Sequence, residues 1–285
     1  MKSNYSKTML WVATMMALPL TFTSCEDSFS EWDSPVTPSN VSTPETPYAS
    51  NEYKEGKWEG GKLSYERKAA TAPTEVADAS TTQSWSGWYT VTGNVTIDEV
   101  TLSDDTNLIL CDGAQLTIKK QIDGNQHTLM IYGQGEGTGK LIVGVAPYSD
   151  HAMSQIEKLQ VHGGVISLTS QKDGIYASDS RVQTLGGKLI VESTADESSA
   201  INAHGAFMYG GEVIAKGKKY GIKASDVFAG ECKLWAYGET GSAYNGWFST
   251  IQGAVFEYSN DGSWTDTPTS LYTHYIRTKG YNPEL

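Results

Sequence analysis

The sequence predicts an all-β fold, namely a right-handed parallel β-helix of about eight three-stranded coils. Glycine pairs followed by short apolar-alternating runs recur at Gly163, Gly186 and Gly210, at steps of 23 and 24 residues. A second landmark of the repeat is a short segment in which one apolar residue stands among small and polar residues. It recurs with the same period from residues 173–177 to residues 220–224. Each repeat holds three strand-sized segments separated by turn residues, and none holds a helical pattern. A unit of this kind is one coil of a β-solenoid.

Other repeat architectures fit the pattern less well. Leucine-rich repeats share the period but need a Leu/Asn consensus that is absent, and propeller blades need about 40 residues. Fainter copies at residues 91–97 and 253–256 extend the repeat in both directions. We therefore expect the β-helix to occupy residues 85–260, with residues 51–84 as an N-terminal cap or linker and residues 261–285 as a C-terminal cap or tail.

Residues 1–24 are organised as a signal peptide. They begin with the basic residues Lys2 and Lys7 and continue through an apolar stretch that is short for a membrane span. Two small residues then precede Cys25 and resemble a bacterial lipobox, in which the cysteine is acylated after cleavage, although Phe22 stands where such boxes usually carry Leu. The alternative is an ordinary secreted protein with an unmodified Cys25.

The segment after Cys25 reads as a flexible tether over residues 25–50, because it is rich in Ser, Thr and Pro and poor in apolar groups. Glu26 and Asp27 resemble the acidic export signals of surface lipoproteins in Bacteroides-type bacteria. We expect an outer-membrane lipoprotein exposed on the cell surface, which contacts the membrane only through the lipid on Cys25.

The composition excludes some partners. The formal charge is −12, and loss of residues 1–24 would make the remainder more acidic, so neither nucleic acid nor an anionic lipid surface is an expected partner. We expect a monomer. Cys111 and Cys232 fall about five coils apart, which is about 24 Å at a coil spacing of about 4.8 Å. A disulfide needs Cα atoms within about 7 Å, so both thiols should be unpaired.

Several segments carry a family resemblance. Residues 88–97, 107–118 and 129–134 are similar to repeats abundant in surface proteins of gut bacteria. The Asp-Gly-Ile-x-Ala and Gly-Gly elements resemble a family of bacterial carbohydrate-binding β-helix proteins, some of which bind calcium and plant cell-wall polysaccharides. The resemblance implies glycan binding, with calcium as a candidate ligand and no required cofactor. The family's calcium positions cannot be transferred, because dense, repeated Asp pairs are absent here.

Alternation along the second landmark selects candidate binding residues. If Ile175 and Ala177 point inward, their neighbours point outward. This predicts a shallow outward column of small residues: Gly174, Ala200, Gly221 and Ala243. Beside it should run a hydrogen-bonding column, which could meet the hydroxyl groups of an extended polymer: Tyr176, Asn202, Lys223 and Asn245. A third column should follow: Ser178, His204, Ser225 and Trp247. The alternative is tight packing between coils under an ordinary polar surface.

Aromatic residues supply a second candidate surface. Trp235 and Tyr237 should point outward, near Trp247 on a later coil, where flat rings could meet the C–H faces of sugars. Alternatively, these rings cover the C-terminal end of the solenoid, which needs a cap over its last unpaired edge.

A metal site is a further hypothesis. Asp173, Asp179 and Asp226 fall at coil corners, where carboxylates could share a calcium ion. Turn chemistry explains them as well, since Asp hydrogen-bonds its own backbone at turns.

Enzymatic activity has little support in the sequence. Arg181 is the one arginine in the repeat body, and the five histidines show no metal-ligand spacing. Three functions stay open: a non-catalytic cell-surface polysaccharide-binding lipoprotein, which we expect; an adhesin-like scaffold for proteins; and a polysaccharide lyase or glycoside hydrolase.

Overall fold

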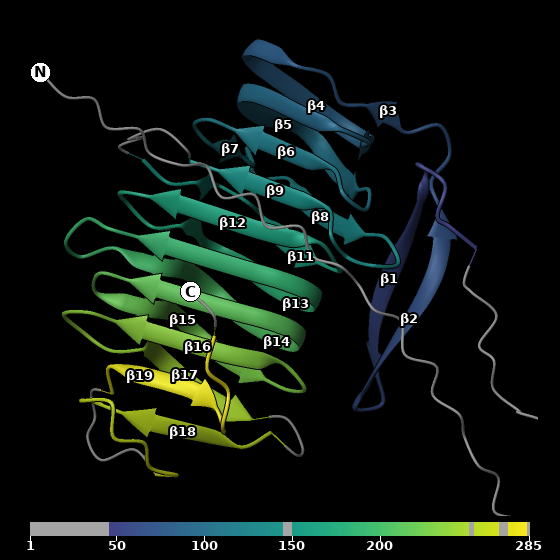
Figure 1. Cartoon of the computed structure of the whole chain (residues 1–285). Coiled ribbons are helices and arrows are strands. Elements are labelled where there is room, and N and C mark those ends of the chain that lie inside the picture. The colour runs from purple at the N-terminus through teal and green to yellow at the C-terminus, as the bar shows by residue number, and fades with distance from the viewer. Residues whose placement is uncertain (1–45, 145–149, 251–253, 268–272, 284–285) are drawn as a thin grey trace, which may run out of the picture. The chain divides into compact units, whose positions relative to one another are not determined.

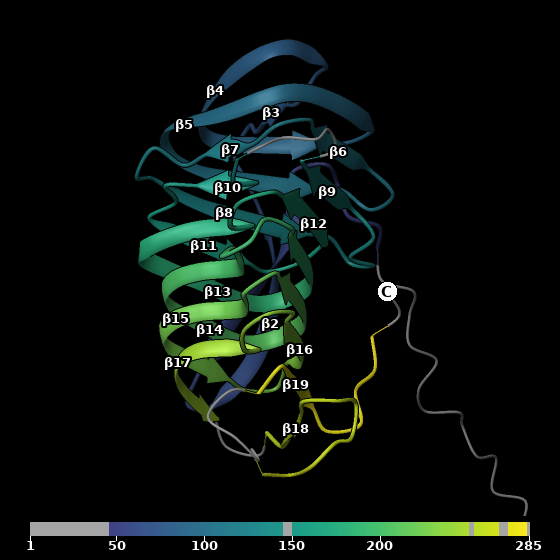
Figure 2. The ribbon, with the colours of Figure 1, turned by 90° about the vertical axis from the view of Figure 1, so that its left-hand side faces the viewer.

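The computed structural model describes residues 46–144, 150–250, 254–267 and 273–283. Cys25, the expected signal peptide and most of the expected tether lie outside these residues. The described part is all-β and contains no helix, so it also contains none that is long and apolar enough to cross a bilayer. Its body is a right-handed parallel β-solenoid of about seven turns (Figures 1 and 2).

In the described part of the chain, the solenoid and its flanking elements comprise 19 strands. In chain order they are β1 (Glu52–Glu59), β2 (Lys62–Ala69), β3 (Thr74–Glu75), β4 (Ala79–Val91), β5 (Asn94–Leu110), β6 (Gln115–Ile118), β7 (Ile122–Asp123), β8 (Thr128–Gly133), β9 (Lys140–Val143), β10 (Met153–Ser154), β11 (Lys158–Val161), β12 (Val165–Ser170), β13 (Ile175–Ser193), β14 (Ser199–Gly217), β15 (Tyr220–Ala229), β16 (Lys233–Gly238), β17 (Tyr244–Thr250), β18 (Phe256–Ser259) and β19 (Tyr275–Thr278). Several strands bend at a corner and continue on the next face of the solenoid.

Three parallel sheets form the faces. Sheet 1 contains the start of β5, then β6, β9, β12, the ends of β13 and β14, and β16. Sheet 2 contains the middle of β5, then β7, β10, and the starts of β13, β14, β15 and β17. Sheet 3 contains the ends of β4 and β5, then β8, β11, the middles of β13 and β14, and the ends of β15 and β17.

The core is built from columns of aliphatic side chains, one residue per coil. Every second residue of a strand points inward, and the coil period places like residues above one another. On sheet 1 the register joins Leu116, Leu141, Ile166, Leu189, Val213 and Leu234. Each of these side chains is at most 1% exposed. The predicted register is therefore confirmed for these coils on sheet 1.

Residues 51–70 form a hairpin and not an end cap. β1 and β2 pair antiparallel and run across several coils beside sheet 3 (Figure 1). Gly56 hydrogen-bonds His162, the Tyr65 hydroxyl donates to the Leu185 carbonyl at 2.8 Å, and Trp58 stacks on Tyr209 with ring centroids 5.0 Å apart. The hairpin thus ties consecutive coils together from outside.

The C-terminal end differs from the prediction. The last expected copy, at residues 253–256, does not make a further coil: Phe256 belongs to β18, which pairs antiparallel with β19. β19 in turn pairs antiparallel with β16, so it covers the edge of sheet 1. This antiparallel closure is why the solenoid has about seven turns and not eight.

Cys111 and Cys232 are buried and unpaired, as predicted. Burial raises the pKa of the Cys232 thiol to about 12 and also raises the pKa of the Cys111 thiol. Both residues belong to the hydrophobic core. They act as small apolar residues and not as reactive groups.

Candidate functional site

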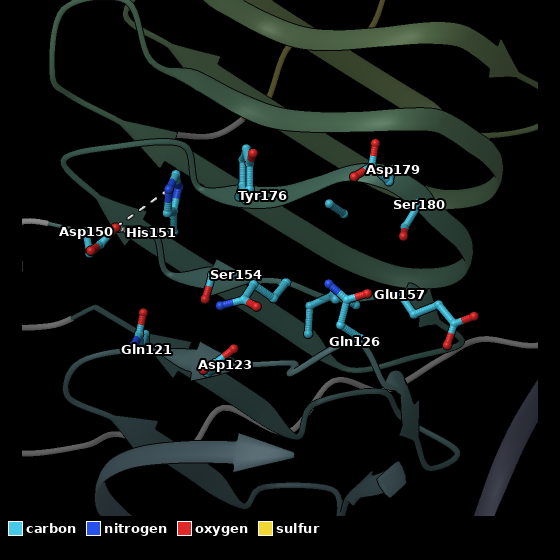
Figure 3. A pocket seen from close by; sticks show the side chains of 13 residues that line it. Gln121, Asp123, Gln126, Asp150, His151, Ser154, Glu157, Tyr176, Asp179 and Ser180 are labelled. Atoms are coloured by element: carbon cyan, nitrogen blue, oxygen red, sulfur yellow. Dashed lines mark hydrogen bonds and ion pairs between the residues drawn. The ribbon is translucent and has the colours of Figure 1, made fainter. Parts of the chain in front are cut away.

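A polar groove of about 520 Å³ lies on sheet 2, across β7, β10 and the start of β13 (Figure 3). It forms there because β7 and β10 are only two residues long and present short outward side chains. Asp123, Ser154 and Tyr176 are in register on three consecutive coils. Ser154 is 8% exposed and, with the buried Ile156, lines the groove between its two ends.

One end of the groove carries an aromatic pair. The rings of His151 and Tyr176 stack with centroids 4.8 Å apart, and Nδ1 of His151 lies 3.1 Å from the Asp173 carbonyl oxygen. Nε2 of His151 lies 3.6 Å from the Asp150 carboxylate, which also pairs with Lys172 at 3.0 Å (Figure 3). These contacts hold both rings in place at the groove edge.

The Asp150 carboxylate is ionised despite its surroundings. Partial burial by itself would raise its pKa, but the Lys172 ammonium and the His151 backbone N–H hold the pKa below its ordinary value. Asp150 therefore contributes a full negative charge to this end of the groove at neutral pH.

The opposite end of the groove is a strained corner between sheets 2 and 3. Asn125, Gln126 and Gln155 have positive φ angles of 45°, 68° and 51°, a region that favours glycine. The Gln126 N–H donates to the Gln155 carbonyl at 2.8 Å, so the two corners are linked. Gln126 and Gln155 line the groove here, and Glu157, Asp179 and Ser180 complete this end (Figure 3).

The predicted hydrogen-bonding column exists. Tyr176, Asn202, Lys223 and Asn245 are in register on four consecutive strands of sheet 2. Tyr176 lines the groove, and the other three continue the column beyond it. Lys223 and Asn245 are exposed, whereas Asn202 is 9% exposed and donates to the Asp173 carboxylate at 2.8 Å.

The expected outward strip of small residues is wrong. Ala200 and Ala243 are fully buried, and a Cβ atom on Gly174 would lie 2.1 Å from Cγ1 of Val191. The chain bends here between sheets 1 and 2, so alternation fails and two successive residues, Ala200 and Ile201, both face inward. The small side chains are needed for close packing at this corner.

The third predicted column is also wrong at its end. Trp247 is in register with Asp226, which pairs with Gly205, and Gly205 pairs with Arg181 on sheet 3. The register shifts between Lys223 and Asp226, which moves the ring to the next face. Trp247 is 72% exposed but does not line the groove.

Trp235 and Tyr237 do not offer open ring faces. Trp235 is only 8% exposed because β19 pairs with β16 alongside it. Tyr237 stacks on Tyr275 of β19 with centroids 4.4 Å apart. The alternative role of these rings, covering the C-terminal end, matches their positions.

The three aspartates proposed for calcium are not brought together. Both carboxylate oxygens of Asp173 are occupied, by the Ser199 N–H at 2.6 Å and by Asn202. Asp179 lines the groove, and Asp226 lies on sheet 3. Of the described residues, only one group of three has ligand atoms close enough to hold a metal, and none of these aspartates belongs to it.

That group comprises Asp104, Asp105 and His127, whose ligand atoms lie within 4.8 Å of one another. The sequence signal was available, because His127 follows Asp104 by 23 residues, one coil period. Both carboxylates already accept backbone hydrogen bonds at 2.8 Å, Asp104 from the adjacent Asp105 N–H and Asp105 from the Thr128 N–H on the next coil. Hydrogen bonding to the backbone therefore accounts for both aspartates.

Sequence reasoning missed most of the groove residues. Ser154 follows Asp123 by 31 residues, whereas Tyr176 follows Ser154 by 22, so the long intervening coil hid the register. The chain matches no protein-family model, no curated protein and no solved structure, so the fold and the groove are the observations on which its function must be argued.

Proposed function

We propose that this protein is a cell-surface lipoprotein, anchored through an acylated Cys25, that binds an extended polysaccharide along sheet 2. The observation that carries the proposal is the polar groove, which continues into the in-register column of Asn202, Lys223 and Asn245. A polymer that runs across the coils meets one hydrogen-bonding side chain at this position of each coil. Carboxylate and amide groups suit sugar hydroxyls, and the His151–Tyr176 pair offers a flat apolar face.

Replacing the aromatic platform tests the groove. Tyr176→Ala should weaken binding to a polysaccharide about tenfold, equivalent to about 1.4 kcal/mol, because the sugar loses its stacking surface. Affinity gel electrophoresis against a panel of plant and microbial polysaccharides measures this directly.

Two matched variants make that result interpretable. Tyr176→Phe keeps the ring and should retain most of the affinity. Trp247→Ala removes an exposed ring that lies on sheet 3 and should leave binding unchanged. Equal losses from Tyr176→Ala and Trp247→Ala would place the glycan somewhere other than the groove.

The anchor has a separate test. Cys25→Ser should abolish incorporation of a labelled fatty acid and move the protein from the outer-membrane fraction to the soluble fraction, since one thiol carries the lipid. Retention of the label in this variant would show that Cys25 is not the lipidation site.

Cleavage of the glycan is a second candidate, favoured by the several carboxylates that line the groove, among them Asp123 and Asp179. Glycosidases use two carboxyl groups that flank the scissile bond. New reducing ends or unsaturated products from a bound polysaccharide, lost in Asp123→Asn or Asp179→Asn, would establish this activity. Binding with no product would leave the non-catalytic proposal standing.

A further inference from the structure

If the groove binds polysaccharides, as proposed above, its charge determines which of them it can bind. Four carboxylates line the groove: Asp123, Asp150, Glu157 and Asp179. Neither Lys nor Arg is among the described lining residues. The groove is therefore strongly anionic in a chain that is itself acidic.

Two lysines close to the groove are engaged by carboxylates. Lys172 pairs with Asp150 at 3.0 Å. Lys120 pairs with Asp98 at 2.8 Å and lies 3.9 Å from Glu99, which in turn accepts a hydrogen bond from the amide of Gln121. These pairs reduce the local charge. Lys158 and Arg181 directly follow Glu157 and Ser180 in the chain, but neither is among the described residues that line the groove.

An acidic polymer would meet repulsion along the whole groove. Salt screens charges only beyond about 8 Å at physiological ionic strength, and a uronate chain seated in the groove would bring its carboxylates well within that range. Recognition of carboxylates and sulfates normally uses the forked donors of Arg, and no Arg is among the described residues that line this groove.

The same groups suit an uncharged sugar. Ionised carboxylates accept strong hydrogen bonds from hydroxyl groups. The two oxygens of one carboxylate can accept hydrogen bonds from two neighbouring hydroxyls of a sugar. Gln126 and Gln155 add amide groups that both donate and accept, and the His151–Tyr176 pair adds an apolar face. We infer that the groove selects uncharged polysaccharides and excludes uronate-containing ones.

The test compares polymers that differ only in charge. The full chain carrying Cys25→Ser is run in affinity gels with each uncharged polysaccharide that binds and with the same polymer after oxidation of its primary hydroxyls to carboxylates. At 0.15 M salt the uncharged form should bind at least tenfold more tightly, and the gap should narrow in 1 M salt as the repulsion is screened. If the preference for the uncharged form does not change with salt, it is not caused by charge repulsion, and the inference is overturned.

Neutralising the groove should abolish the discrimination. In Asp123→Asn/Glu157→Gln/Asp179→Asn, the preference for the uncharged form should fall below about threefold. Lys140→Gln, which removes an exposed cation from sheet 1, should leave the preference unchanged, and a change in it would show that the discrimination follows the net charge of the protein and not the groove. The single variant Asp179→Asn should shift the preference in the same direction if the triple variant does not fold.

The outcomes separate this inference from the proposed function. Tighter binding of the oxidised forms would overturn the inference and leave polysaccharide binding intact. Binding of oxidised forms only with 1 mM calcium, reversed by a chelator, would also overturn it, by showing that a cation bridges the two sets of carboxylates. Absence of binding to any polysaccharide would instead refute the proposed function.

Discussion

Gly187→Ala should destabilise the solenoid by about 3 kcal/mol or more, one of the largest effects expected of a single methyl group in this protein. Gly187 has a φ of 72°, which costs a residue with a side chain about 1 to 3 kcal/mol. An added Cβ atom would also lie 2.5 Å from the Gly164 carbonyl oxygen and 2.9 Å from Cα of Gly163. The backbone of the adjacent coil would have to move, so overpacking adds to the strain. Urea unfolding followed by circular dichroism measures the change.

Gly113→Ala is the matched control for this effect. Gly113 also has a positive φ, of 78°, but no atom lies within 4 Å of an added Cβ. Its substitution should cost about 1 kcal/mol from backbone strain alone. Equal losses in the two variants would mean that contact between neighbouring coils does not explain the glycine pairs. A larger loss of stability in Gly187→Ala would mean that the glycine pairs recur once per coil because the backbones of neighbouring coils pack closely there.

The repeat made the fold predictable, because one local pattern recurs on successive coils. Ile175, Ile201 and Ile222 occupy one position of the second landmark, and the structure stacks them in one column. A register derived from one pair of coils therefore applied to the next, and Tyr176 and Asn202 were placed correctly relative to each other. Such repetition supplies long-range information that a non-repetitive sequence lacks.

The prediction failed where the chain departs from the repeat. Ala200 faces inward at a corner, and strict alternation cannot describe a bend. Trp235 is covered by a strand that begins at Tyr275, 40 residues further along the chain and outside any repeat. No local pattern could reveal that contact. The groove depends on the long coil before Ser154, whose length breaks the period that identified the other columns.

The hairpin was the least predictable element, because its partner surface is made of residues from many coils. β1 is anchored by His162, which is 5% exposed and stacks on Tyr132 with centroids 4.6 Å apart. Nδ1 of His162 lies 3.1 Å from both the N–H nitrogen and the carbonyl oxygen of Gly56. Nε2 is buried and has no hydrogen-bond partner among the described residues. The sequence identified His162 only as one of five histidines without metal-ligand spacing.

Acid should weaken this anchor and with it the folded state. Burial lowers the pKa of His162 to about 4, against its ordinary 6.5; Glu55 and the Gly56 bond oppose the shift, and Lys158 and Lys68 reinforce it. Because the pKa of His162 is lower in the folded state, the unfolded chain binds the proton first as the pH falls. The stabilisation is therefore complete above pH 6.5 and is lost as the pH falls from 6.5 toward 4. The shift corresponds to about 3 kcal/mol.

The histidine can be isolated by comparing pH profiles of the unfolding free energy. His162→Gln keeps a hydrogen-bonding side chain but cannot titrate, so between pH 7 and pH 4 its stability should fall by about 3 kcal/mol less than that of the wild-type protein. His204→Gln removes an exposed histidine and should follow the wild-type profile. Parallel profiles for the wild-type protein and His162→Gln would mean that the unfolding free energy does not depend on protonation of His162. A difference confined to the range from pH 6.5 to 4 would assign the acid sensitivity to the buried ring that holds the hairpin against the solenoid.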